Sequence, residues 1–398
     1  MRVLMLSWEY PPHVVGGLGK HVAELAPALA DLGIELYLLT PMRRGGAERE
    51  TIAGIRVYRI PSPANVYPNF YEEVVHTNET LERACEELLA TEGPFELIHN
   101  HDWLTSFVAR RLKHAHKLPL LATIHATERG RGRGQLLGEQ AQRVNDAEWR
   151  LTYEAWRVIC CTRFMADEIH RYFQVPLDKV DVIPNGVDPT PFQKLEGQDL
   201  SAFRARWAQP EEKIVLYVGR VVQEKGAEIL VRSAPFVLAR VPEAKFIIAG
   251  TGPELERLRD LVQELGLSTK VLLPGFIDDK DRDRLYKVAD CAVFPSLYEP
   301  FGIVALEAMA AKTPVVVSEV GGLAEVVRHA ETGITIYPGD VQSCAWGILH
   351  TLEHPEWTRQ RVQNAYEEVL RVYNWHTIAE QTAKVYRRIV EERARVYW

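Results

Sequence analysis

Short apolar runs alternate with amphipathic helical patterns along most of the chain, and this alternation limits the possible folds more than any other feature. Residues 3–7 and 34–39 form apolar runs, and the residues between them place apolar side chains at helical spacing. Strands that alternate with helices form parallel sheets whose two faces are both covered. The alternation stops in a turn-rich stretch, residues 183–210, and restarts at residues 214–219. The sequence therefore predicts an α/β protein with two doubly wound, Rossmann-like domains.

The pattern also predicts the individual elements and the domain limits. The expected strands are residues 3–7, 34–39, 55–60, 97–99, 120–125 and 157–161, then 214–219, 245–249, 271–273, 291–295 and 314–317. The expected helices after the first are residues 79–91, 103–116 and 139–154, then 226–240, 253–265, 281–289 and 302–311. We expect domains at residues 1–188 and 189–375, a terminal amphipathic helix at 376–398, and a ligand cleft between the domains.

Composition and charge exclude several classes of protein. The 398 residues include 47 Lys and Arg against 54 Asp and Glu, and the net charge of −7 gives no general attraction to nucleic acid. The five cysteines show no CxxC spacing, so neither a zinc cluster nor a disulfide framework is expected. No apolar run approaches the ~20 residues that span a bilayer, and the N-terminal run is too short for a signal peptide. We expect a cytoplasmic protein with no transmembrane segment.

A glycine-rich turn opens the first predicted helix. Gly16, Gly17 and Gly19 follow the first strand, where free backbone amides and the helix N-terminus favour an anion. The run is not GxGxxG, and Thr40 stands where a dinucleotide-binding domain has an acidic residue. A phosphate site and a plain strand-to-helix turn are both open interpretations.

Two cations follow the first strand of the second domain. Arg220 ends the run 214–219, and Lys225 lies just before Gly226. At the carboxyl end of a parallel strand they suit a diphosphate, because Arg can contact two oxygens and Lys supplies a point charge. Two solvated loop cations are the alternative.

Two carboxylates flank a short apolar helix start. Glu299 precedes Pro300 and so stays in the loop, whereas Glu307 lies inside the helix. Carboxylates suit a ligand with several hydroxyls, and the free amides at Phe301, Gly302 and Ile303 suit a phosphate. The alternative has Glu299 as a helix cap and Glu307 as a solvated charge.

Polar side chains also follow two strands of the first domain. Asp102 lies in the segment His-Asn-His-Asp-Trp, and His125 ends the run 120–125. We expect both to line the ligand site. The H-x-H spacing is unspecific for a metal, and buried, hydrogen-bonded histidines are the simpler interpretation. The basic, glycine-rich residues 128–134, which include Arg129, suggest a mobile loop that closes on an acceptor.

Taken in order, these motifs resemble retaining glycosyltransferases of the GT-B fold, in the GT4 family with its glycogen and starch synthase relatives. The resemblance covers nearly the whole chain. The motifs that carry it are Gly16–Gly19, the segments 99–103, 123–125 and 183–188, Gly219-Arg220 with Lys225-Gly226, and the pair Glu299 and Glu307.

The resemblance implies a role for each matching residue. Arg220 and Lys225 would hold the nucleotide diphosphate, Glu307 the ribose, and Glu299 the donor sugar with the amides near Phe301. The amide of Gly17 would contact the distal phosphate, and His125 would lie beside the anomeric carbon. Gly16, Asp102 and Arg129 are the candidates for contact with the acceptor.

The same resemblance suggests substrates. We expect transfer of a glucosyl group from ADP-glucose or UDP-glucose to an α-1,4-glucan, with retention of configuration, no cofactor and no metal ion. Bacterial glycogen synthases carry a lysine where this chain has Val14, and Lys20 lies beyond the glycine turn instead. Transfer to a small sugar, of the sucrose-phosphate or trehalose synthase type, is the alternative.

Two further classes suit the same architecture. A nucleotide-sugar epimerase or a dinucleotide oxidoreductase also uses doubly wound domains, although the dinucleotide fingerprint is missing. A non-catalytic sugar-binding protein would not need Arg220, Lys225, Glu299 and Glu307 together.

Overall fold

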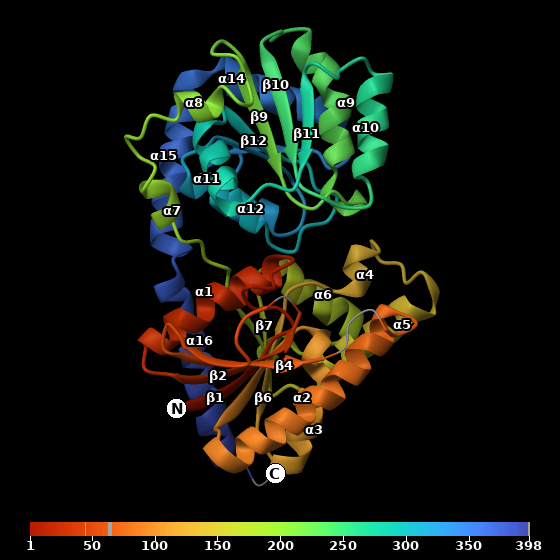
Figure 1. Ribbon diagram of the computed structural model, residues 1–398, viewed down its shortest axis with the longest axis vertical. Helices are drawn as coiled ribbons and strands as arrows, with labels where there is room; N and C mark the ends of the chain where they lie inside the picture. The colour runs from red at the N-terminus through yellow and green to blue at the C-terminus, as the bar shows by residue number, and fades with distance from the viewer. Residues whose placement is uncertain (44, 63–65, 397–398) are drawn as a thin grey trace. The chain divides into compact units, whose positions relative to one another are not determined.

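The computed structural model describes residues 1–43, 45–62 and 66–396 and divides the chain into two compact units. Unit 1 comprises Met1–Asn185 and the segment from Trp375 onward, and unit 2 comprises Gly186–Asn374. Each unit contains one twisted sheet with helices on both faces (Figure 1). The predicted α/β class with two Rossmann-like domains is therefore confirmed.

The sheet of unit 1 has the strand order β3-β4-β2-β1-β5-β6-β7-β8. Its neighbours are parallel except for the antiparallel pair β3 and β4. The central strands are almost wholly buried, as expected where helices cover both faces. The strands are β1 (Arg2–Leu6), β2 (Glu35–Met42), β3 (Arg49–Ile52), β4 (Ile55–Pro61), β5 (Leu97–His101), β6 (Leu120–Ile124), β7 (Arg157–Cys160) and β8 (Val180–Val182).

Helices cover this sheet on two sides. One apolar cluster joins β1 and β2 to α1 (Gly17–Asp31) and α16 (Trp375–Ala394). The other helices are α2 (Phe70–Glu92), α3 (Ser106–His116), α4 (Glu128–Arg131), α5 (Gly138–Glu154) and α6 (Arg163–Phe173). The predicted start of α2 at residue 79 was wrong, because Asn69 caps the helix by accepting from the backbone N–H of Glu72.

The sheet of unit 2 has the order β11-β10-β9-β12-β13-β14, and all neighbouring strands are parallel. Its strands are β9 (Lys213–Val218), β10 (Ala244–Ala249), β11 (Val271–Gly275), β12 (Cys291–Phe294), β13 (Val315–Ser318) and β14 (Ile334–Ile336). Its helices are α7 (Thr190–Gln193), α8 (Ser201–Arg204), α9 (Ala227–Leu238), α10 (Leu255–Glu264), α11 (Asp279–Val288), α12 (Ile303–Ala310), α13 (Leu323–Val326), α14 (Val341–Glu353) and α15 (Pro355–Val372). Helices α9, α10 and α14 share one apolar core, and α11 and α12 lie on the opposite face (Figure 1).

Helix α16 belongs to the core of unit 1 although it follows unit 2 in the sequence. Ile378, Tyr386 and Ile389 have no solvent exposure and lie in the same apolar cluster as Leu25 and Leu29 of α1. Burial of this face, rather than helix propensity, is what holds α16 in place.

Strand β5 carries two fully buried histidines, and one of them connects the sheet to α16. The Nδ1 atom of His99 lies 2.7 Å from the hydroxyl of Tyr386, and its Nε2 atom lies 2.7 Å from that of Thr123. Burial lowers the pKa of His99 and of His101 well below the ordinary histidine value. Both side chains are therefore neutral in the folded protein.

We expect Ile389→Ala to destabilise unit 1 by about 2–5 kcal/mol, because it removes a buried side chain and leaves a cavity. Urea unfolding followed by circular dichroism measures this loss. Lys384→Ala, at an exposed position of the same helix, is the control and should change stability little. Equal stability of the two variants would contradict the packing of α16 on unit 1.

Stability should also depend on pH through His99. Its folded-state pKa is lowered, so on acidification through pH ~6.5 the unfolded chain takes up a proton that the folded chain does not. Stability is therefore lost as the pH falls, and His99→Gln removes this contribution. The urea midpoint of the wild type should fall more between pH 7.5 and 5.5 than that of His99→Gln. Identical pH dependence in the two proteins would show that His99 is not held neutral.

Candidate active site

Each sheet has one point at which the strand order reverses, and most of the predicted site residues follow strands at or beside these two points. In unit 1 the chain leaves β1 toward β2 on one side and continues from β5 on the other. In unit 2 the corresponding neighbours are β9 and β12. Open parallel sheets bind ligands beyond the carboxyl ends of such strands.

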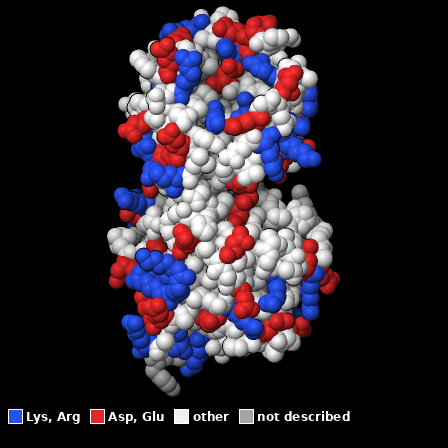
Figure 2. Space-filling model, turned by 90° about the vertical axis from the view of Figure 1, so that its left-hand side faces the viewer, with Lys and Arg blue, Asp and Glu red and all other residues white. Residues whose placement is uncertain are grey.

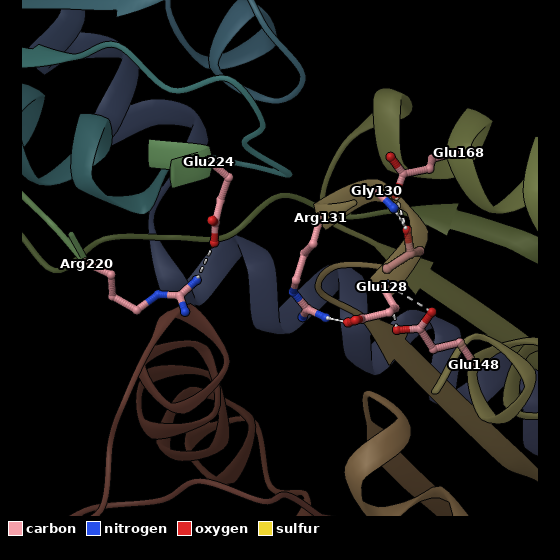
Figure 3. Close-up of polar contacts among 8 residues, drawn as sticks. Glu128, Gly130, Arg131, Glu148, Glu168, Arg220 and Glu224 are labelled. Atoms are coloured by element: carbon pink, nitrogen blue, oxygen red, sulfur yellow. Dashed lines mark hydrogen bonds and ion pairs between the residues drawn. The ribbon is translucent and has the colours of Figure 1, made fainter. Parts of the chain in front are cut away.

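In unit 2, the loop after β9 positions Arg220 and Lys225. Arg220 is half exposed, and its guanidinium lies 3.4 Å from a carboxylate oxygen of Glu224 (Figure 3). Gly226 follows with a φ of +66°, and a Cβ atom there would lie 2.0 Å from the carbonyl oxygen of Pro295. Only glycine allows this close approach of the loop to the end of β12, so the glycine is what lets Lys225 reach the neighbouring strand.

Lys225 and Glu299 form the closest charged contact at this point of the sheet. The Nζ atom of Lys225 donates to Oε2 of Glu299 at 2.6 Å, and the side chains are 21% and 10% exposed. The backbone carbonyl of Glu299 accepts from Gly322, which follows β13, at 2.8 Å. Two residues predicted from separate motifs thus meet, one from the loop after β9 and one from the loop after β12.

Helix α12 begins at Ile303, four residues after Glu299, and its first amides have no side-chain cap. Its N-cap is Gly302, whose φ of +105° is a conformation that favours glycine. A Cβ atom at this position would also lie 2.5 Å from Cδ2 of Leu323. Phe301 is buried and Ile303 half-buried, so their backbone N–H groups, rather than their side chains, are suited to an anion.

Glu307 lies inside α12 and is buried. It accepts a hydrogen bond from the hydroxyl of Tyr286 in α11 at 3.2 Å. The guanidinium of Arg282, also in α11, is among the charges that act on this carboxylate. Tyr286 and Arg282 were not predicted as site residues. The spacing of apolar and charged residues in α11 indicates which face of the helix is buried, but it does not indicate which helix that face contacts.

In unit 1, the glycine turn already holds a carboxylate. One oxygen of Glu9, Oε2, accepts from the backbone N–H groups of Val15 at 2.7 Å and Gly16 at 3.1 Å. A Cβ atom on Gly19 would lie 2.6 Å from the same oxygen, so glycine makes room for it. The turn before Gly17 is therefore built to hold negative charge, which Glu9 supplies in this structure.

His125 lies directly after β6 within a group of neutral imidazoles. Its Nε2 atom is 3.2 Å from Nδ1 of His101, and its ring centre is 4.7 Å from that of His21 in α1. Burial lowers the pKa of His125 to about 3. His21 is held by Asn185, whose side-chain oxygen lies 2.6 Å from Nδ1 of His21. The sequence motifs contained His101 and Asn185 but not His21, and they did not indicate that His21 brings these residues together beside His125.

Asp102 acts on the backbone of His125. Its Oδ1 atom accepts from the backbone N–H of His125 at 2.7 Å, and Asp102 itself has a φ of +56°, rare for a residue with a side chain. Burial raises the pKa of Asp102 to about 6. The carboxyl group therefore positions the loop that carries His125 within unit 1.

The segment predicted as a mobile loop at residues 128–134 contains the short helix α4. The Thr127 hydroxyl caps this helix by accepting from Gly130, and both carboxyl oxygens of Glu148 accept from the backbone N–H of Glu128 at 3.0 Å (Figure 3). Burial raises the pKa of Glu148 to about 8. The Arg129 guanidinium lies over the ring of Tyr172, 5.1 Å from its centre. Interior contacts therefore anchor the start of this segment.

Three histidines of unit 1 lie close enough together to act as ligands of one metal ion. One ring nitrogen from each of His21, His101 and His125 lies within 4.8 Å of the others. The Nε2 atoms of His21 and His101 are buried without a hydrogen-bond partner, and neutral imidazole is the form that binds metals. One nitrogen of His125 is engaged with His101, so a metal ion would have to replace that hydrogen bond.

Charged side chains of both signs are interspersed on the face of the molecule in Figure 2. Within the described residues, no helix combines the length and the apolar character that crossing a membrane requires.

Comparison with known proteins places the chain in a family. The family model "Glycosyltransferase Family 4" matches residues 15–190, and "Glycosyl transferases group 1" matches residues 201–368. An uncharacterized glycosyltransferase of Methanocaldococcus jannaschii is 40% identical, over 98% of this chain and 99% of that protein. A glycogen synthase of Mycobacterium tuberculosis is 34% identical, over 97% of this chain and 94% of its own length.

A solved structure agrees with these sequence matches. Sucrose-phosphate synthase from Thermosynechococcus elongatus superimposes with a TM-score of 0.85 and 28% identity, covering 98% of this chain and 99% of that one. The predicted resemblance is thereby confirmed, and the chain belongs to the GT4-type glycosyltransferases of the GT-B fold, as a hexosyltransferase.

Proposed function

We propose that the protein is a retaining glucosyltransferase that transfers glucose from ADP-glucose or UDP-glucose to an α-1,4-glucan. The observation that carries this proposal is the contact between Lys225 and Glu299 beside the uncapped start of α12. This contact brings together a cation that can bind a phosphate and a carboxylate that can bind sugar hydroxyls. Both lie at the point where open parallel sheets bind ligands. The similarity to a glycogen synthase supports the choice of a glucan.

Each candidate site residue of unit 2 has a proposed part in donor binding. Arg220 and Lys225 bind the diphosphate, and the amides of Phe301, Gly302 and Ile303 bind phosphate or sugar oxygens at the positive end of α12. Glu299 accepts hydrogen bonds from the donor sugar. Glu307, held by Tyr286, accepts those of the ribose hydroxyls.

Residues of unit 1 act on the sugar and the acceptor. His125 contacts the reacting sugar as a neutral imidazole, and the amide of Gly17 contacts the distal phosphate. Gly16, Asp102 and Arg129 are assigned to the acceptor side. Of these, Asp102 acts as a positioning residue through the backbone of His125.

In the transfer step, the bond between the anomeric carbon and the diphosphate oxygen breaks while the acceptor oxygen bonds to the same face of that carbon. The acceptor proton passes to the departing diphosphate. Positive charge grows on the sugar ring and negative charge on the leaving group, and the fixed cations Arg220 and Lys225 stabilise the latter. The proposed chemistry needs neither a metal ion nor a cofactor, because these side chains supply the positive charge.

Transfer to a small sugar is the second candidate. The structural similarity to a sucrose-phosphate synthase over 98% of this chain favours it, as does Val14 where bacterial glycogen synthases carry a lysine. Fructose 6-phosphate and glucose are then the first acceptors to try.

A donor and acceptor screen tests the proposal. Purified protein is incubated with ADP-, UDP- or GDP-glucose, with and without a short maltooligosaccharide, and nucleotide release and glucan length are measured. We expect release from ADP- or UDP-glucose that depends on the glucan and lengthens it. Release that requires a small sugar instead would support the second candidate, and NAD(P) binding without binding of any nucleoside diphosphate would contradict both.

We expect Lys225→Ala to lower kcat by about 10²- to 10³-fold, because it removes a fixed charge from the leaving group. Steady-state nucleotide release measures the effect, and circular dichroism checks that the variant is folded. Lys280→Ala is the matched control, since Lys280 is an exposed lysine of α11 in the same unit. Normal turnover by Lys225→Ala would exclude the proposed role of this residue.

A further inference from the structure

Unit 2 has a pocket of about 720 Å³ that contains none of the residues assigned to the donor. It lies around the carboxyl end of the edge strand β14 and the start of α14. The lining side chains with recognisable chemistry are Glu319, His329, Tyr337, Asp340, Gln342 and Trp346, and we call this site the aromatic pocket. Its volume lies in the range of small-molecule sites.

Aromatic rings are unusually exposed in and beside the aromatic pocket. Tyr337 is 69% and Trp346 47% exposed. The ring of His329 stacks on that of Trp346 with an angle of 16° between their planes. Large aromatic side chains are ordinarily buried, and exposed rings that also line a pocket suit a ligand with flat apolar faces.

The rings continue from the aromatic pocket along two helices. Trp346 and His350 of α14 have ring centres 5.2 Å apart, and His350 stacks on Trp357 of α15 at 5.8 Å. Trp357 is itself 60% exposed. This row of aromatic rings is therefore longer than a single sugar ring or a single amino-acid side chain, and it suits an extended ligand.

Polar groups in the aromatic pocket define the charge of that ligand. Glu319 and Asp340 carry exposed carboxylates, and Gln342 carries an exposed amide. One oxygen of Asp340 also caps α14 by accepting from the backbone N–H of Ser343 at 2.9 Å. Like charges repel, so the two carboxylates disfavour a phosphate, a nucleotide or an acidic peptide. Carboxylates and amides instead accept hydrogen bonds from hydroxyl groups.

His329 adds a hydrogen-bond donor. Its Nδ1 atom accepts from the backbone N–H of Thr335 at 3.1 Å, so a neutral ring carries its proton on Nε2. The aromatic pocket therefore combines flat apolar faces, acceptors and a donor. A neutral sugar has the complementary surface, with an apolar C–H face and hydroxyls at its edge.

We propose that the aromatic pocket binds a segment of a neutral oligosaccharide, namely the α-glucan, separately from the donor site. This inference rests on the proposed function for the identity of the glucan. A second contact with the same polymer raises the effective concentration of its chain ends near the enzyme. The glucan is thus both the acceptor and a ligand held on the surface of unit 2.

Glucan binding in the absence of any donor tests the proposal independently of catalysis. Migration of the protein in native gels that contain glycogen gives an apparent Kd, and calorimetry with maltoheptaose gives a second value. We expect Trp346→Ala to weaken both by about three- to tenfold, because it removes one stacking face. Glu319→Gln is a second variant, for use if Trp346→Ala fails to fold. It keeps the aromatic faces but removes the charge of one acceptor, and it should also weaken glucan binding.

Trp149→Ala is the matched control. Trp149 is an exposed tryptophan of unit 1, 43% exposed and stacked on Tyr153, and its replacement should leave glycogen affinity unchanged. Failure of the wild type to bind glycogen and maltoheptaose would overturn the proposal, as would equal affinity of wild type and a folded Trp346→Ala. Loss of self-association in Trp346→Ala without loss of glucan binding would assign the aromatic pocket to a second copy of the chain instead. Glucan binding through Trp346 in a protein without transferase activity would uphold the aromatic pocket and reject the proposed function.

Discussion

Parallel pairing of strands determines where chemistry can occur in this protein. Parallel neighbours cannot be joined by a tight turn, so each connection crosses a face of the sheet, and helices bury the strands on both sides. Only at the point of reversal do successive connections leave on opposite faces and their loops diverge. The loops after β9 and β12 in unit 2, and after β1, β5 and β6 in unit 1, lie at or beside these points, and they carry Lys225, Glu299, Asp102 and His125.

The two units prepare different electrostatic surroundings at these loops. In unit 2 opposite charges are partly exposed and paired, as Lys225 and Glu299 show, so a charged ligand can exchange partners with them. In unit 1 burial keeps His21, His101 and His125 neutral, and a carboxylate occupies the amides of the glycine turn. A protein that separates charge on a substrate benefits from such fixed groups, because they need not reorganise during the reaction.

The sequence predicted the class of fold and most strands because β-structure buried on both faces produces continuous apolar runs. The prediction failed where the helix propensity of a residue disagreed with the packing that the fold requires of it. Helix α14 was not predicted, and its Gly347 is unfavourable in a helix, yet a Cβ atom there would lie 2.6 Å from Ile336 of β14. Close packing of α14 against β14 explains this glycine. The distance between the two elements cannot be predicted from a pattern in a single sequence.

In the candidate site too, some residues could be predicted from sequence patterns, whereas others depend on contacts that only the fold creates. Motifs of charged residues and glycines indicated Lys225 and Glu299, and the fold brings them into contact. Tyr286 was not found in this way, and the motif at residues 183–188 contained Asn185 without indicating its partner. Each acts through one side-chain hydrogen bond, to Glu307 and to His21, made across the fold by residues far apart in the sequence. Sequence spacing within an element carries no information about such partners.

The position of α16 has a consequence for biosynthesis. Unit 1 begins at Met1, but its core includes Ile378, Tyr386 and Ile389, which the ribosome adds only after all of unit 2. The first unit to emerge is therefore the last to be completed, and until then its apolar surface beside α1 stays open to chaperones or to other nascent chains. Unit 2, whose residues are contiguous, can finish folding earlier.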